Sequence, residues 1–102
     1  MTARFIALYE TPADPEEFEH HYREVHAPLA RQLPGLRRYT LSRGVTAVRG
    51  EAYSLIAELD WDSMNDLRVA FASPPGRATA ADAAKLGELA PVRSMTFIVQ
   101  EA

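Results

Sequence analysis

Apolar residues recur at intervals of three and four in the segment 14–35, which predicts a helix with one apolar face. Asp14 is the expected N-cap, Pro15 occupies the first helical position, and Glu17 completes a capping-box pattern. Pro34-Gly35 ends the helix. The residues of the predicted apolar face are Phe18, Tyr22, Val25, Leu29 and Leu33.

The remaining pattern predicts four strands and two further helical segments. Short apolar or alternating runs indicate strands at 4–9, 36–45, 52–61 and 95–99. Asp62 or Ser63 caps a helix that Ser73-Pro74-Pro75-Gly76 breaks, and a short alanine-rich helix follows at 79–89. The order βαββαβ is the ferredoxin-like arrangement, an α+β fold with a four-stranded antiparallel sheet and helices on one face. We expect a single domain over residues 1–102.

Two of the predicted strands are apolar on both faces, although helices cover only one face of the sheet. In strand 4–9, Phe5 and Ala7 alternate with Ile6 and Leu8, and strand 95–99 has the same character. A sheet with one solvated face would carry polar residues there. We therefore expect the bare face to pack against a second copy, giving a homodimer.

Composition narrows the partners. The chain of 102 residues has 47% hydrophobic and 25% charged residues and a net charge of −3, which disfavours nucleic acid. It contains no cysteine, which excludes disulfides and thiolate chemistry. We expect a cytoplasmic protein without a membrane segment, because no apolar run has the length of a bilayer span.

His26 is the foremost candidate for chemistry. It lies two residues before Pro28, which cannot donate to the carbonyl of Glu24, so we expect a kink that opens a gap beside the histidine. A partly desolvated imidazole suits proton transfer, and a histidine at the core edge that donates to a backbone carbonyl fits the same pattern. On a straight helix His21 and His26 lie about 140° apart, so we predict surface positions for His20 and His21 and no metal site.

Aromatic residues supply a candidate pocket wall. Tyr22 neighbours His26 on the helix, and Tyr39 and Trp61 can lie on strand faces beneath it. Tyr53 and Phe71 are weaker candidates for the same wall. Aromatic residues at such positions more often belong to the core than to a binding site, but a hydroxyl in an apolar wall can orient a small substrate.

Two segments together resemble the EthD family, which is named for a protein encoded beside an ether-degrading cytochrome P450 system. The residues that carry the resemblance are Tyr9, Pro12, Asp14-Pro15, Phe18, Tyr22, His26-Ala27-Pro28-Leu29, Leu33-Pro34-Gly35-Leu36 and Tyr39, followed by Phe71-Ala72-Ser73-Pro74-Pro75-Gly76 through Asp82. The resemblance implies a dimeric α+β barrel that binds small apolar or aromatic molecules. It maps the family's histidine to His26 and a tyrosine of its isomerase-like members to Tyr39.

The sequence departs from that family at two points. Position 75 is proline where many relatives carry an acid, and the cysteine used by isomerase-like members is absent. Two functions remain open. The first is cofactor-independent proton transfer by His26 with Tyr39 as donor, of an isomerase, dehydratase or cyclase type, in a degradation or secondary-metabolite pathway. The second is a binding module that delivers a small molecule to an oxygenase without turnover. Haem ligation by His26 follows from analogy at fold level alone.

Overall fold

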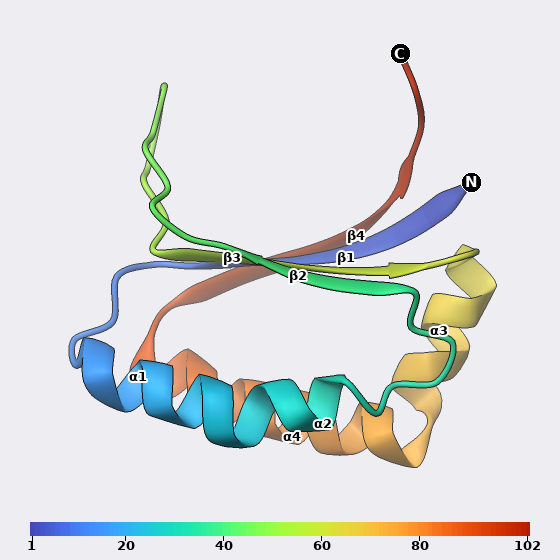
Figure 1. Ribbon diagram of the computed structural model, residues 1–102, viewed down its shortest axis with the longest axis horizontal. Helices are drawn as coiled ribbons and strands as arrows, with labels where there is room; N and C mark the ends of the chain where they lie inside the picture. Colours follow the sequence, from blue (N-terminus) through green and yellow to red (C-terminus); the bar gives the residue numbers. More distant parts are fainter.

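The computed structural model describes residues 1–102 as one sheet covered on one face by helices (Figure 1). The sheet order is β2-β3-β1-β4 with every neighbouring pair antiparallel, which confirms the predicted ferredoxin-like fold. The elements are β1 (Thr2–Tyr9), α1 (Pro15–His21), the π-helix η1 (Tyr22–His26), α2 (Ala27–Ala30), β2 (Arg38–Ser42), β3 (Leu55–Trp61), α3 (Met64–Ala72), α4 (Pro74–Leu89) and β4 (Val92–Val99). None of these helices has the length and apolar character needed to cross a membrane.

The first helical segment contains a π-turn that the sequence pattern did not predict. The chain runs from α1 through η1 into α2, and the Ala27 N–H donates to the Tyr22 carbonyl five residues back. A π-turn adds one residue to a helical turn, so every side chain beyond it moves to a new face. Val25, predicted to be buried, is therefore 40% exposed, and His26 takes its place in the interior at 6%.

The helix α4 begins earlier than the sequence indicated. We predicted a break at residues 73–76 and a helix from Thr79, but α4 starts at Pro74. The Ser73 hydroxyl accepts a hydrogen bond from the Gly76 N–H at 3.2 Å, and prolines occupy the first two helical positions, where no intrahelical N–H is required. The same four residues therefore end α3 and start α4.

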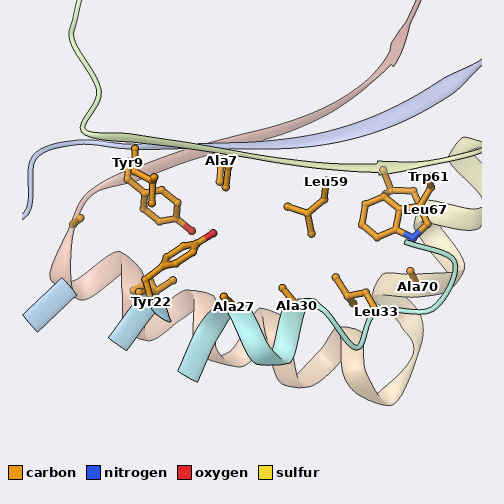
Figure 2. Close-up of a cluster of buried hydrophobic side chains, with 14 of the residues drawn as sticks. Ala7, Tyr9, Tyr22, Ala27, Ala30, Leu33, Leu59, Trp61, Leu67 and Ala70 are labelled. Carbon is orange, nitrogen blue, oxygen red and sulfur yellow. The ribbon is translucent and has the colours of Figure 1, made fainter. Parts of the chain in front are cut away.

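The core lies between the helices and the inner face of the sheet (Figure 2). The register pairs Ala7 with Ala57 and Phe5 with Leu59, so alternate residues of β1 and β3 share that face. Trp61 is fully buried at the end of β3, and its Nε1–H donates to the Pro34 carbonyl at 2.9 Å. This bond ties the sheet to the chain that leaves α2.

The outer face of the sheet has no covering layer (Figure 1). The register pairs Ile6 with Met95 and Arg4 with Phe97, so these residues lie on that outer face. Met95 is 49% exposed and Phe97 37%. Arg4 forms ion pairs there with Asp60 and Glu58. On the outer face, apolar residues of β1 and β4 therefore lie beside the charged cluster of Arg4, Glu58 and Asp60.

Candidate active site

A cavity of about 280 Å³ lies between the sheet and the helical layer. Eleven of its fourteen lining residues are hydrophobic, and the helix α4 supplies three of the fourteen. The lining residues are Phe5, Ala7, Tyr9, Tyr22, His26, Ala30, Tyr39, Ala57, Leu59, Phe71, Thr79, Ala80, Ala83 and Ser94. Small side chains such as Ala7, Ala30 and Ala57 leave this space open, because they cannot fill the distance between the two layers.

His26 lines this cavity at the last position of the π-helix. Its Nδ1 lies 2.9 Å from Oδ2 of Asp82 on α4, and its Nε2 has no partner within the protein. No fully buried side-chain nitrogen or oxygen lacks a hydrogen bond, so Nε2 is not completely enclosed by the protein. Burial lowers the pKa of His26 from its ordinary value, against the opposing effect of Asp82. A lowered pKa keeps the imidazole neutral at pH 7, which a general base requires.

His21 shares the carboxylate of Asp82 with His26. Its Nε2 lies 2.8 Å from Asp82 Oδ1, so each carboxylate oxygen faces one imidazole. The prediction that His21 is a solvated residue was wrong, because that expectation assumed a straight α-helix. A π-turn is closed by a bond between residues five apart, which brings positions 21 and 26 to the same side. His20 is exposed, as predicted.

The grouping of two histidines and one carboxylate does not make a metal site. The ring nitrogens point at the carboxylate oxygens at hydrogen-bond distance, so no position remains between them for a shared ion. No group of three or more histidine or carboxylate side chains in the chain has a metal-binding arrangement.

Three tyrosine side chains bring hydroxyl groups into the same site. The hydroxyls of Tyr22 and Tyr39 lie 2.5 Å apart. The ring of Tyr9 packs edge-on against Tyr22, and both hydroxyls point into the space between sheet and helices (Figure 2). Burial raises the pKa of all three phenols, so each stays protonated and can donate a hydrogen bond.

One hydroxyl of the Tyr22–Tyr39 pair must donate to the other. Either oxygen of the pair can be the donor at this distance. With Tyr22 as the donor, the Tyr39 O–H is free to donate to another acceptor. Tyr9 has no hydrogen-bond partner and, because no buried oxygen lacks one, its hydroxyl is accessible as well.

The structure brings together four of the six residues named from the sequence. His26, Tyr39, Tyr22 and Phe71 all line the cavity. Trp61 lies outside it, packed in the core beside Phe71 with ring centroids 5.6 Å apart. Tyr53 also lies outside it, in the loop between β2 and β3.

Three residues of the site were missed by sequence reasoning: Tyr9, His21 and Asp82. Tyr9 shares the period-two pattern of Phe5 and Ala7, which places it on the inner face of β1. Asp82 is a single acid within an alanine run, and a buried acid there requires a partner. The sequence therefore indicated that Asp82 needs a partner, but the partners, His21 and His26, lie on a helical segment far away along the chain.

No lysine or arginine lines the cavity. A haem group carries two anionic propionates, and a carboxylate ligand carries one, and neither would meet a cation inside. The residues present therefore do not fit haem, and they favour a neutral ligand.

Residues 10–89 match the EthD domain, and the chain belongs to the EthD family. It is 37% identical over 83 residues to an uncharacterised 11.0 kDa protein of Rhodococcus erythropolis, covering 79% of this chain and 80% of that protein. A crystal structure of an ethyl tert-butyl ether d (ethd) family protein from Bacillus halodurans superposes with a TM-score of 0.87 at 35% identity, covering 98% of this chain and 100% of that one.

A more distant neighbour has a named activity. SnoaB from Streptomyces nogalater, a cofactor-independent oxygenase, gives a TM-score of 0.69 at 26% identity, covering 99% of this chain and 95% of that one. Other solved chains below 25% identity share the fold and are described as dimeric ferredoxin-like proteins. These likenesses establish the family and the fold, and the named activity is that of SnoaB.

Proposed function

We propose that this EthD-family protein binds a small, neutral, largely apolar molecule in the cavity and catalyses proton transfer without a cofactor. The observation that carries the proposal is that His26, whose Nε2 has no partner within the protein, lines an apolar cavity together with the phenols of Tyr9, Tyr22 and Tyr39. A base and hydrogen-bond donors around one ligand are what deprotonation to a stabilised anion requires.

His26 is the proposed catalytic base. Its Nε2 accepts a proton from an acidic C–H or O–H of the ligand, and the imidazolium that forms keeps its Nδ1–H bond to Asp82. The Tyr39 O–H donates to the oxygen on which negative charge develops, supported by the donor Tyr22. Tyr9 is a second donor of the same kind. Return of the proton to a different atom completes an isomerisation with no external reactant.

The lining indicates the class of ligand. A volume of about 280 Å³ is near the lower limit for small-molecule pockets, so the ligand is compact. The aromatic rings of Phe5 and Phe71, with centroids 5.3 Å apart, offer an apolar wall to a flat molecule. We therefore propose an aromatic or enolisable carbonyl compound without charge. SnoaB shows 26% identity and a cofactor-independent activity, which supports this class of chemistry.

Deuterium exchange tests this function without knowledge of the full reaction. Neutral phenols, enolisable ketones and lactones would be screened for binding, and binders would then be incubated with protein in D₂O and followed by NMR. We expect exchange at the acidic position with wild type, a loss of about 10²–10⁴-fold in His26→Gln, and a loss of about 10²–10³-fold in Tyr39→Phe. His20→Gln, on the same helix but exposed, is the matched control.

The outcomes separate the two functions. Exchange that persists in His26→Gln would exclude His26 as the base. Tight binding with no exchange in wild type would favour the second function, a module that binds or delivers a small molecule to an oxygenase. That alternative is favoured by the absence of a second strong acid or base in the cavity lining. A place in ethyl tert-butyl ether degradation and a cytoplasmic location are also part of the proposal, and growth of a deletion strain and cell fractionation test them.

We also propose that the protein is a homodimer joined through the outer faces of the two sheets. The apolar residues Ile6, Met95 and Phe97 on that face support this assembly, as do the dimeric neighbours. Phe97→Asp should yield a monomer by light scattering at micromolar concentration. Val69→Asp, on the exposed side of α3, should stay a dimer. A monomeric wild type would contradict the assembly.

A further inference from the structure

Asp82 is a buried acid whose two oxygens are both occupied by histidine. Its side chain is 6% exposed, that of His26 8% and that of His21 23%. In the proposed function Asp82 only accepts the Nδ1–H of His26, and His21 has no role. A carboxylate buried to this degree is retained in folded proteins only with well-placed donors.

Hydrogen-bond chemistry fixes the protons of both rings. An ionised carboxylate can only accept, so the imidazole nitrogens that face it must both carry hydrogen. His26 is then protonated at Nδ1 and bare at Nε2, the nitrogen available to the cavity. His21 carries hydrogen at the Nε2 that faces Asp82. The tautomer of each ring follows from the partner that its other nitrogen meets.

We propose that Asp82 is the positioning residue of this site, which holds His26 in the tautomer that presents an unprotonated Nε2 to the cavity, and that His21 is the second donor that holds the Asp82 carboxylate. The catalytic use of this tautomer rests on the proposed function. Asp82 itself does not touch the ligand, since it is absent from the cavity lining.

The π-turn supports this assignment because it is what makes the shared contact possible. Residues five apart diverge on an α-helix, but here the turn from Tyr22 to His26 brings His21 and His26 onto one carboxylate. Single π-turns inside helices are frequent at functional sites. Pro28, which has no N–H to donate, lies two residues after the end of this turn.

The surroundings of His26 contain no competing charge. Asp82 faces it from α4, His21 and Tyr22 from its own helical segment, and Tyr9 and Tyr39 from the sheet. Burial lowers the pKa of His26, Asp82 raises it and His21 lowers it. The two partners therefore act on the basicity of the ring in opposite directions, and each can be removed separately.

Nitrogen NMR of the histidine rings tests the inference without any ligand. In wild type at pH 7.5 we expect the His26 Nδ1 signal of a protonated nitrogen and the Nε2 signal of a bare one. In Asp82→Ala the ring should shift toward the Nε2–H form that an unconstrained histidine favours. In Asp82→Asn only one amide oxygen remains, so one of the two rings must change tautomer. Glu88→Gln, exposed on the same helix, should change nothing.

A second variant keeps the inference testable if removal of Asp82 prevents folding. In His21→Ala the titration midpoint of His26 should move upward, because a neighbour that lowers its pKa is gone, and His26 should keep its tautomer. Circular dichroism would confirm that each variant is folded. An unchanged His26 tautomer in folded Asp82 variants, or a changed His26 tautomer in folded His21→Ala, would overturn the proposal.

The two proposals fail separately. If His26→Gln abolishes deuterium exchange but the Asp82 variants keep the wild-type tautomer, His26 is the base and Asp82 does not position it. If the tautomer changes as expected but wild type exchanges no ligand proton, Asp82 positions His26 in a binding site. If His26 is the base and Asp82 positions it, Asp82→Asn should lower the turnover rate far more than it weakens ligand binding.

Discussion

Gly76 is the position where a single methyl group should most disturb the frame that carries Asp82. It lies at the start of α4, pressed against the end of α3. A Cβ placed there would lie 2.2 Å from the Ala70 carbonyl oxygen and 2.5 Å from that of Phe71. An ordinary carbon–oxygen contact is about 3.3 Å or more, so one helix must move by about 1 Å. Both obstacles are backbone atoms, which cannot rotate away.

We expect Gly76→Ala to destabilise the protein by about 1–3 kcal/mol. Overpacking typically costs about 1–3 kcal/mol, and the greater helix preference of alanine returns at most about 1 kcal/mol. Gly87→Ala is the matched control in the same helix, because its added Cβ would meet only Val92 Cγ1 at 3.8 Å. That change should stabilise the protein by about 0.5–1 kcal/mol.

Urea denaturation followed by the fluorescence of Trp61, the one tryptophan, measures both changes. The variants would be compared at one protein concentration, because dimerisation makes stability depend on it. A Gly76→Ala variant as stable as wild type, with the same denaturant slope, would refute the close approach of α3 and α4.

Three further predictions address the site and its frame. Burial lowers the pKa of His26 below its ordinary 6.5, so between the two values the unfolded chain binds a proton that the folded chain does not. The free energy of unfolding should therefore fall as the pH drops through that window. In denaturation experiments from pH 7.5 to 5, this free energy should decline less in His26→Gln than in His20→Gln. Trp61→Phe should cost roughly 1–3 kcal/mol, since it removes the bond to Pro34 and part of a fully buried ring; thermal denaturation by circular dichroism checks this, and an unchanged midpoint would contradict it. Tyr22→Phe should cost only about 0.5–1.5 kcal/mol, because cavity water can satisfy Tyr39, and a loss above about 3 kcal/mol in urea denaturation would show that the Tyr22 hydroxyl has another role.

The site joins two helices that are distant in sequence. Asp82 is 56 residues from His26 and 61 from His21, and it reaches both through the packing of α4 against the π-helix. Any change that moves α4 therefore reaches His26 through Asp82. This links the stability of the α3–α4 junction to the chemistry proposed for the cavity.

Local signals in the sequence were enough to predict the elements and their order. Asp14 caps α1 by accepting from the Glu17 N–H, and Ser63 caps α3 by accepting from Asp66, as their spacing indicated. Alternation along β3 placed Leu55, Ala57, Leu59 and Trp61 on one face, and all four are buried. Such signals involve residues within four positions of one another, so the sequence states them directly.

Only the tertiary structure decided which side chains meet in the site. The π-turn before Pro28 rotated His26 inward in place of Val25, a one-residue shift that helical periodicity does not encode. The pairing of His26 and His21 with Asp82 depended on how α4 lies against the first helical segment. Trp61 could have lined the cavity, but a hydrogen bond to Pro34 holds it in the core. The sequence by itself thus determined the fold and the candidate base, and packing between distant segments determined the partners of that base.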